Sequence, residues 1–409
     1  MERHLALALP QKFKRRVDDP SDEAEHQSKR RLVSSAYGRT VFGVFCQPYP
    51  TPILHDWMRL SDKIFSPRFS ATSKEGKHLQ GGLKSDLSLS FLDESFGAAC
   101  KGFYVVASSR GYLLCLNKSS RSQNTDYVIC NPMTKEFEVL PRSQHAHVDV
   151  AIALIIDTDT TDSVTSIDEL EFKVAKTAPP NPRGMWSNLI MEVYSSSTKG
   201  WLQKNVVADV AFRLDVPWRS GFAIGDASFW TVVFNAPPNH PHWVKEITGL
   251  VVYNFDEDGG GAKLIKPPTL GGIGVEFSVP VSECFGSCRG NVVYSRCDEN
   301  VMEVWRLTDF KEVEEEWIMI HTVNLVNISI YPPEFRSYIG LDEVGNVNPE
   351  LLGFYSIDFN LVLISFSDQA FWYNLDTKEA YTVDKDVGTV RTYFVYEALA
   401  LEGNQGSQD

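Results

Sequence analysis

The sequence lacks any long hydrophobic run. Its most apolar stretches, residues 151–156 and 361–366, are about six residues long, whereas a transmembrane helix needs about 20. It also lacks an extended stretch with the 3.6-residue period of a helix. From about residue 85 onward, short runs of Val, Ile, Tyr, Phe and Trp are separated by Gly, Pro, Asn and Asp. This pattern predicts an all-β chain without a membrane span.

Common catalytic and nucleotide-binding motifs are missing as well. The sequence contains no GxxxxGK[ST], GxGxxG, HExxH or GxSxG, so it offers no phosphate-binding loop and no familiar hydrolase nucleophile. We therefore expect a protein that is not an enzyme, with no catalytic, cofactor-binding or metal-binding residue and no cofactor.

Basic residues are scarce relative to acidic ones, and their distribution is uneven. The formal net charge is −14, which argues against a general binder of nucleic acid or of anionic membranes. Residues 1–40 carry +3 and the remainder −17. We interpret residues 1–40 as a disordered basic tail. Its two basic clusters, Arg15-Arg16 and residues 29–31, resemble a weak nuclear-import signal.

The sequence has only seven cysteines, an odd number, and their spacing does not suggest a set of pairs. They occupy positions 46, 100, 115, 130, 284, 288 and 297. An odd number without a secretory leader favours reduced thiols in the cytoplasm or the nucleus. The spacing of Cys284, Cys288 and Cys297 lacks the close pairs of a zinc site, so we expect buried strand cysteines.

One histidine cluster is the strongest catalytic lead. On a strand, alternation would place His145, His147 and Asp149 on one face, where two imidazoles can chelate one metal ion. His240 and His242 form a second pair. Both pairs lie near prolines, and solvated loop histidines are the favoured interpretation. A metal-dependent propeller hydrolase that uses His145, His147 and Asp149 stays open as an alternative.

An internal repeat predicts the architecture. Five times, an apolar strand ends in an aromatic or β-branched residue and is followed by a polar turn and a second strand. The copies are residues 127–137, 191–201, 250–259, 302–309 and 371–381. Equivalent strand positions are 65, 59, 52 and 68 residues apart, which is typical of propeller blades lengthened by insertions.

The repeats divide the chain into units. We expect four-stranded blades at residues 96–141, 148–205, 210–268, 275–326 and 335–383. A strand at 391–400 would pair with N-terminal strands at 41–46 and 87–92, because a closed ring leaves no bare edges. This predicts a β-propeller of six blades, with seven as the alternative. The predicted domains are a tail at 1–40, a segment with ring-closing strands at 41–95, a propeller at 96–400 and a disordered C-terminus at 401–409.

Several phrases resemble the F-box-associated propeller domains of plant F-box proteins, which are kelch-like. The similar segments, in the order of the family's own phrases, are residues 88–92, 108–115, 127–137, 140–141, 172–174, 191–196 with Trp201, and 302–307 with Trp317 and His321. The resemblance covers roughly residues 41–400. It implies a propeller that recognises a protein substrate for an SCF-type E3 ubiquitin ligase, while an F-box binds a Skp-type adaptor and, through it, a cullin.

The sequence departs from the family at its N-terminus. Residues 1–40 contain no helical F-box pattern, and residues 57–69 resemble only the tail of an F-box. We therefore expect a non-catalytic protein-interaction module that is part of such a ligase or derived from one, in the cytoplasm, the nucleus or both. A stand-alone propeller scaffold is the alternative. Predicted contact loops are residues 157–168, 176–187, 235–245 and 328–350.

Overall fold

The computed structural model describes eighteen segments of the chain. They are residues 39–48, 68–71, 87–97, 102–117, 126–143, 151–157, 166–177, 185–214, 221–235, 246–255, 261–268, 282–297, 301–311, 316–324, 350–354, 358–366, 369–384 and 390–399. Thr40–Ala398 form one compact unit. A second unit comprises Met1–Arg39 and Leu399–Asp409, of which only Arg39 and Leu399 are described. The predicted tails at 1–40 and 401–409 therefore lie almost wholly outside the described residues.

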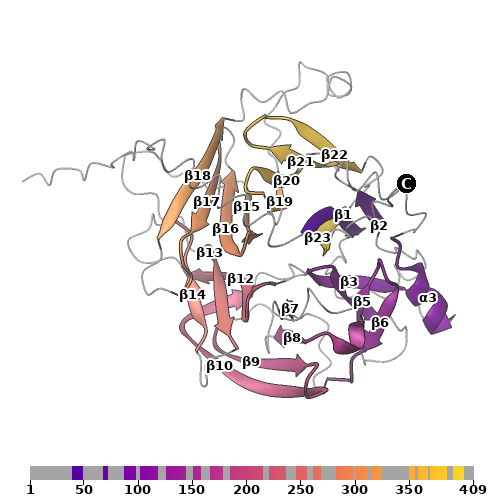
Figure 1. Ribbon diagram of the computed structural model, residues 1–409. Helices are drawn as coiled ribbons and strands as arrows, with labels where there is room; N and C mark the ends of the chain where they lie inside the picture. The colour runs from indigo at the N-terminus through magenta and orange to yellow at the C-terminus, as the bar shows by residue number, and fades with distance from the viewer. Residues whose placement is uncertain are drawn as a thin grey trace, which may run out of the picture. The chain divides into compact units, whose positions relative to one another are not determined.

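The compact unit is an all-β, propeller-like fold of antiparallel sheets (Figure 1). Sheet 1 has the order β3 (Phe103–Ser109), β4 (Tyr112–Asn117), β5 (Asp126–Asn131), β6 (Glu136–Val139). Sheet 3 has the order β15 (Ser282–Cys288), β16 (Asn291–Cys297), β17 (Val301–Leu307), β18 (Trp317–Asn324). Sheet 4 has the order β19 (Glu350–Phe354), β20 (Leu361–Phe366), β21 (Gln369–Asn374), β22 (Ala380–Asp384). Each of these sheets follows chain order and matches one predicted four-stranded unit.

Sheet 2 joins two of the predicted units. It contains β7 (Ala151–Ile156), β8 (Phe172–Thr177), β9 (Trp186–Ser195), β10 (Gly200–Leu214), β11 (Phe222–Ile224), β12 (Ala227–Asn235), β13 (Glu246–Asn254) and β14 (Lys263–Ile265). Strand β10 pairs with β9 from Gly200 to Val207 and again at Phe212, with a register shift in that ladder between Val207 and Phe212, and its residues Phe212–Leu214 pair with β12. The predicted units at 148–205 and 210–268 are therefore joined by a continuous strand, because no Gly or Pro interrupts residues 201–214.

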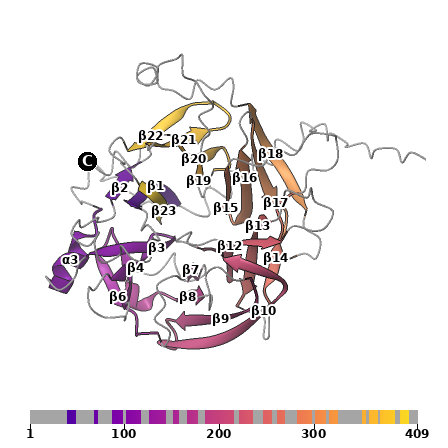
Figure 2. The same ribbon diagram turned by 180° about the vertical axis from the view of Figure 1, so that it is seen from behind.

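Sheet 5 brings the two ends of the compact unit together. Its order is β2 (Arg68–Ala71), β1 (Arg39–Pro48), β23 (Val390–Leu399), and β1 and β23 lie side by side in Figures 1 and 2. The predicted pairing of the C-terminal strand with residues 41–46 is confirmed. Strand β2 includes the last two residues of the F-box-like segment 57–69, whose other residues lie outside the described part of the chain.

The predicted strand at residues 87–92 is wrong. Residues Ser90–Phe96 form the helix α3 instead. Alternating Leu and Ser from Leu87 to Ser90 imitates a strand, but the buried pair Phe91 and Leu92, with Phe96 one turn later, forms a helical face. That face packs on sheet 1, where the ring of Phe96 lies 5.1 Å from the ring of Phe103.

The central strands have two buried faces, which explains their continuous apolar runs. In β16, Val293 and Cys297 belong to the core between sheets 3 and 4. The alternate residues Val292 and Tyr294 belong to the core that sheet 3 shares with β12 and β13. Sheet 3 is thus packed on both of its faces, as propeller blades are.

The repeated turns have the same geometry. In the turn after β5, the Oδ1 atom of Asn131 accepts from the backbone N–H of Met133 at 2.9 Å, and the N–H of Lys135 donates to the carbonyl of Asn131 at 2.8 Å. In the turn after β21, Asn374 makes the equivalent bonds to Asp376 and Lys378 at 2.9 and 2.8 Å. The asparagines fix these turns through side-chain-to-backbone bonds.

Candidate functional site

The residues predicted as alternative metal ligands are not described by the structure. His145, His147 and Asp149 fall in the segment 144–150, and His240 and His242 fall in 236–245. Within the segments that are described, no group of three or more His, Cys, Asp or Glu side chains could hold a metal ion. Cys284, Cys288 and Cys297 are buried in β15 and β16, as expected of strand cysteines.

For the predicted contact loops, the structure describes mainly the residues at their ends. Asn235 and Glu246, which flank the 236–245 segment, pair across β12 and β13. Within 157–168, Ser166 caps the short 3₁₀ helix η2 (Ile167–Glu169) through its side chain, which accepts from the N–H of Asp168. Of 328–350, only Glu350 is described, at the start of β19. The described strands therefore supply fixed bases for these loops.

A buried polar network lies beside two segments of the chain, 144–150 and 178–184, of which the second belongs to the predicted contact loop 176–187. Lys176 Nζ is 2.9 Å from Glu192 Oε2, and both side chains are almost fully buried. The hydroxyl of Ser143 donates to the same carboxylate oxygen at 2.5 Å and contacts the ammonium of Lys176. Ser143 is the last described residue before 144–150, and Lys176 comes one residue before the end of β8, after which 178–184 begins. The network fixes the bases of both segments against each other.

Aromatic rings enclose the ammonium of Lys176. Its Nζ atom lies 5.2 Å from the ring centroid of Trp201 and 5.7 Å from that of Tyr127. Tyr127 belongs to sheet 1, whereas Lys176 and Trp201 belong to sheet 2. Trp201 Nε1 also donates to the carbonyl of Pro141 at 2.6 Å. Cation–π attraction and this hydrogen bond therefore connect the two sheets around a desolvated charge.

The ion pair with Glu192 bears on whether Lys176 could act as a base towards Ser143. Burial lowers the pKa of the Lys176 ammonium, while the hydrogen bond and charge of Glu192 oppose that shift. A lysine that acts as a base towards a serine must lose its proton. The carboxylate of Glu192 at 2.9 Å favours the protonated form instead. Lys176, Glu192 and Ser143 thus form one buried network, in which Glu192 accepts from both Lys176 and Ser143.

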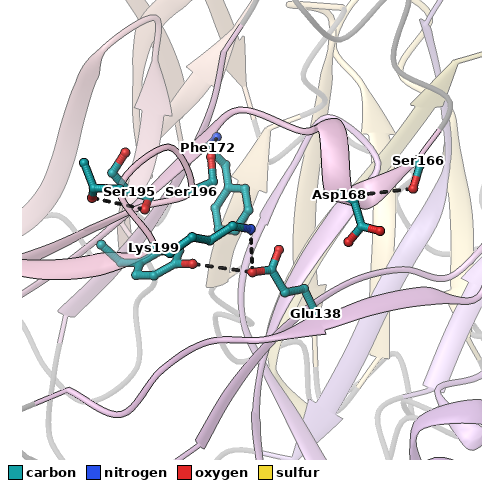
Figure 3. Close-up of polar contacts among 9 residues, drawn as sticks. Glu138, Ser166, Asp168, Phe172, Ser195, Ser196 and Lys199 are labelled. Atoms are coloured by element: carbon teal, nitrogen blue, oxygen red, sulfur yellow. Dashed lines mark hydrogen bonds and ion pairs between the residues drawn. The ribbon is translucent and has the colours of Figure 1, made fainter.

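A second polar contact connects the same two sheets near the surface. Glu138 of β6 accepts from Lys199 Nζ at 2.9 Å and from the hydroxyl of Tyr194 at 3.5 Å. Figure 3 shows Lys199 reaching Glu138 from the turn between β9 and β10. Because the side chain of Lys199 is 55% exposed, solvent screens this pair and its contribution to stability is small.

The ion pairs Lys176–Glu192 and Arg296–Glu303 occur in two copies of the repeated sequence motif. Met191-Glu192-Val193-Tyr194 and Met302-Glu303-Val304-Trp305 occupy equivalent places in β9 and β17. In each copy the glutamate lies opposite a basic residue of the preceding strand, Lys176 or Arg296, and forms an ion pair with it. We did not predict these pairs. The available signal was a charged residue inside an otherwise apolar strand, with a complementary charge in the strand before it.

Tyr194 should make stability depend on alkaline pH. Burial, followed by the charge of Glu138, raises the pKa of Tyr194 from 10.0 to about 12. Its contribution is complete below pH 10, the unfolded value, and is lost as pH rises through about 12. We expect the urea midpoint of unfolding to decrease as the pH is raised from 10 to about 12. Tyr194→Phe should reduce this fall only in part, because the pKa of Tyr373 is also raised to about 12. An unchanged slope in Tyr194→Phe would contradict the assignment.

Comparison with known families and structures gives one family match. Residues 77–335 match the family model described as "F-box protein At3g26010-like, beta-propeller". Comparison with curated proteins gives no match. In the described part of the chain, neither α3 nor η2 has the length and apolar character needed to cross a membrane.

The chain is also similar to solved structures, at low identity. TolB from Acinetobacter baumannii is 10% identical with a TM-score of 0.40, covering 91% of this chain and 72% of TolB. A post-proline cleaving enzyme from Rickettsia typhi is 11% identical with a TM-score of 0.36, covering 90% and 56%. The β-propeller domain of the trilobed protease from Pyrococcus furiosus is 9% identical with a TM-score of 0.29, covering 64% and 75%.

Proposed function

Because the chain belongs to the F-box protein At3g26010-like β-propeller family, with 77–335 matched, we propose that it is a non-catalytic substrate-recognition module of an SCF-type E3 ubiquitin ligase. The family match is the observation that carries this proposal. In it, the propeller binds a protein substrate through its loops, while a Skp-type adaptor and a cullin connect it to the ubiquitin-transfer machinery. The protein would work in the cytoplasm, the nucleus or both.

The geometry of the described residues supports an interaction role. The buried network of Ser143, Lys176 and Glu192 fixes the bases of two adjoining segments, and rigid bases allow variable loops to present a binding surface. Polar contacts such as that of Lys199 with Glu138 also join sheet 2 to sheet 1. We propose six blades, with the propeller at 96–400 and the adaptor-binding segment within 41–95.

A stand-alone propeller scaffold is the second candidate function. The family match begins at residue 77, and the F-box-like segment 57–69 precedes it. Under this candidate, the chain binds its partner without an adaptor.

Adaptor binding separates the two candidates. We expect the full chain, co-expressed with a Skp-type adaptor and a cullin, to co-purify with both in stoichiometric amounts. Trp57→Ala combined with Leu60→Ala should abolish this association, because both residues belong to the F-box-like segment. The matched control is Leu202→Ala, since Leu202 is an exposed residue of β10, 61% accessible. Absence of adaptor from the purified wild-type complex at micromolar concentrations would reject the ligase role in favour of the scaffold.

A further inference from the structure

Part of strand β10 lies at a free edge of sheet 2. Residues 200–207 of β10 pair one by one with β9, whereas the pairing of β10 with β12 is confined to Phe212–Leu214. On the side away from β9, the described residues form one bridge to this part of the strand, between Ala208 and Ala262. Residues 200–205, which we call the β10 edge, therefore have a strand neighbour on one side alone within the described part of the chain.

One hydrogen bond shows which backbone groups point outward from the β10 edge. The carbonyl of Val207 accepts from the N–H of Ala262 at 2.9 Å, so it points away from β9. In an antiparallel ladder, the N–H and C=O of one residue point to the same side, and that side alternates along the strand. Trp201, Gln203 and Asn205 therefore also direct their N–H and C=O groups away from β9. Among the described residues, none forms a hydrogen bond with these outward groups.

The other outer strands of sheets 1 to 4 have features that discourage edge pairing. Strands β6, β14 and β22 are four, three and five residues long. Strand β18 has eight residues, but its ladder with β17 contains a register shift. Short strands, bulges and prolines are the usual means by which proteins protect a sheet edge. Strand β10 has a regular ladder from Gly200 to Val207 and no proline, so its edge is suited to accept a further strand.

The side chains at this edge include two exposed aliphatic groups and one cation. Leu202 and Val207 are 61% and 59% exposed, the highest values among the large hydrophobic side chains described. They project from opposite faces of the strand, because successive side chains alternate. Lys204 is the single charged residue of 200–208 and projects from the same face as Leu202. Its Nζ atom lies 5.6 Å from the ring centroid of Tyr253, and no described carboxylate forms an ion pair with it.

We propose that the β10 edge binds an extended segment of a protein partner as an added antiparallel strand, with a carboxylate side chain of the partner opposite Lys204 and an aliphatic one opposite Leu202. An extended chain is the occupant that presents backbone donors and acceptors at the spacing of a strand. A second copy of this edge is the poorer match, because 200–208 contains no acidic residue to place opposite Lys204. The assignment rests on the substrate-recognition role proposed above and gives that substrate a conformation and a charge.

Fluorescence anisotropy of labelled peptides with the purified full chain tests this assignment. The probe carries Val-Thr-Glu-Thr-Leu-Thr at its centre, which in antiparallel register places its Glu opposite Lys204 and its Leu opposite Leu202. Its three Thr residues then direct their N–H groups towards the β10 edge. We expect N-methylation of these three residues to weaken binding at least about tenfold, because their hydrogen bonds are lost. N-methylation of Val, Glu and Leu, whose N–H groups point away, should leave the affinity within about twofold.

Variants of the chain test the backbone contacts and the charge separately. Gln203→Pro removes one outward N–H and should weaken binding at least about tenfold, while its urea midpoint stays close to the wild-type value because an edge strand tolerates proline. Lys204→Glu should reverse the preference, so that a probe with Lys in place of Glu binds more tightly than the original. The control Ile318→Ala changes an exposed residue of β18 and should bind like the wild type.

Hydrogen exchange of the wild-type chain gives a readout that needs no variant. The amides of Trp201, Gln203 and Asn205 should exchange more slowly when the unmodified probe is present. Unchanged exchange, equal affinity of the two N-methylated probes, or no binding of the unmodified probe at millimolar concentration would overturn the proposal. A wild-type dimer that Gln203→Pro dissociates would assign the edge to a second copy and would overturn it too. Adaptor co-purification with Gln203→Pro is expected to be unchanged, so failure here is distinguishable from failure of the ligase role.

Discussion

Replacing Glu192 with Gln should destabilise the protein by about 3 kcal/mol, since removal of one partner leaves a buried charge uncompensated. The ammonium of Lys176 would then remain enclosed by the rings of Tyr127 and Trp201. Neither ring supplies the negative charge that Glu192 provides at 2.9 Å. The measurement is the free energy of unfolding from urea denaturation. We also expect the chain next to Ser143 and Thr177 to become more susceptible to limited proteolysis in this variant.

A double variant separates the energy of the pair from the cost of breaking it. Lys176→Met combined with Glu192→Leu places two apolar side chains of similar volume in the same site. Its stability should return to within about 1 kcal/mol of the wild type, or exceed it, because no charge remains to be desolvated. Lys199→Gln is the exposed control and should cost less than about 1 kcal/mol. A Glu192→Gln cost equal to that of Lys199→Gln would refute the buried pair.

The strands and their turns could be predicted from local sequence because each repeat encodes them locally. Asn131 and Asn374 occupy equivalent turn positions and make equivalent bonds, so a recurring phrase was sufficient. Continuous apolar runs, such as β7, indicated strands buried on both faces. The family resemblance came from the same recurring phrases and is confirmed by the match over 77–335.

Two elements could not be predicted because tertiary packing decides them. Helix α3 begins in a segment that alternates like a strand, and the packing of Phe96 on Phe103 favours the helix. Strand β10 continues past its main pairing with β9 in one uninterrupted run and pairs with β12 at its C-terminal end. A sequence read as separate repeats contains no signal for this continuation, since the individual units look complete without it.

The polar contacts could not be predicted, because they depend on which strands pair and in which register. Lys176 and Glu192 are opposite each other only because β8 and β9 pair in that register. Arg289 in the turn between β15 and β16 and Arg306 of β17 both reach the ring of Phe359, in the connection between β19 and β20. Their separation along the chain gave no reason to group them. Charges within apolar strands indicate that partners exist, and only the strand register identifies which partners they are.

Gly221→Ala should be the most damaging small substitution at a described glycine. A Cβ atom at this position would lie 2.5 Å from Cδ1 and 2.6 Å from Nε1 of Trp230, and 2.7 Å from the carbonyl oxygen of Phe229. Trp230 is 2% exposed, and its ring is enclosed by the core of sheet 2. The backbone oxygen of Phe229 is fixed because β12 pairs with β13. Neither neighbour can move away cheaply, so we expect a loss of about 3 kcal/mol, as for overpacking of a dense core.

The same change at Gly353 tests whether the loss of stability expected at Gly221 comes from the lack of space or from the replacement of a glycine as such. A Cβ atom at Gly353 has no neighbour within 4 Å, so Gly353→Ala should be neutral or stabilise the strand by about 0.5 kcal/mol through reduced backbone entropy. Gly221 also donates its N–H to the carbonyl of Ile152 at 2.7 Å, which joins the start of β11 to β7. Any shift that relieves the clash with Trp230 must therefore disturb this bond. Equal unfolding free energies for the two variants would show that the core of sheet 2 accommodates the extra methyl group, and that Gly221 is not required by packing.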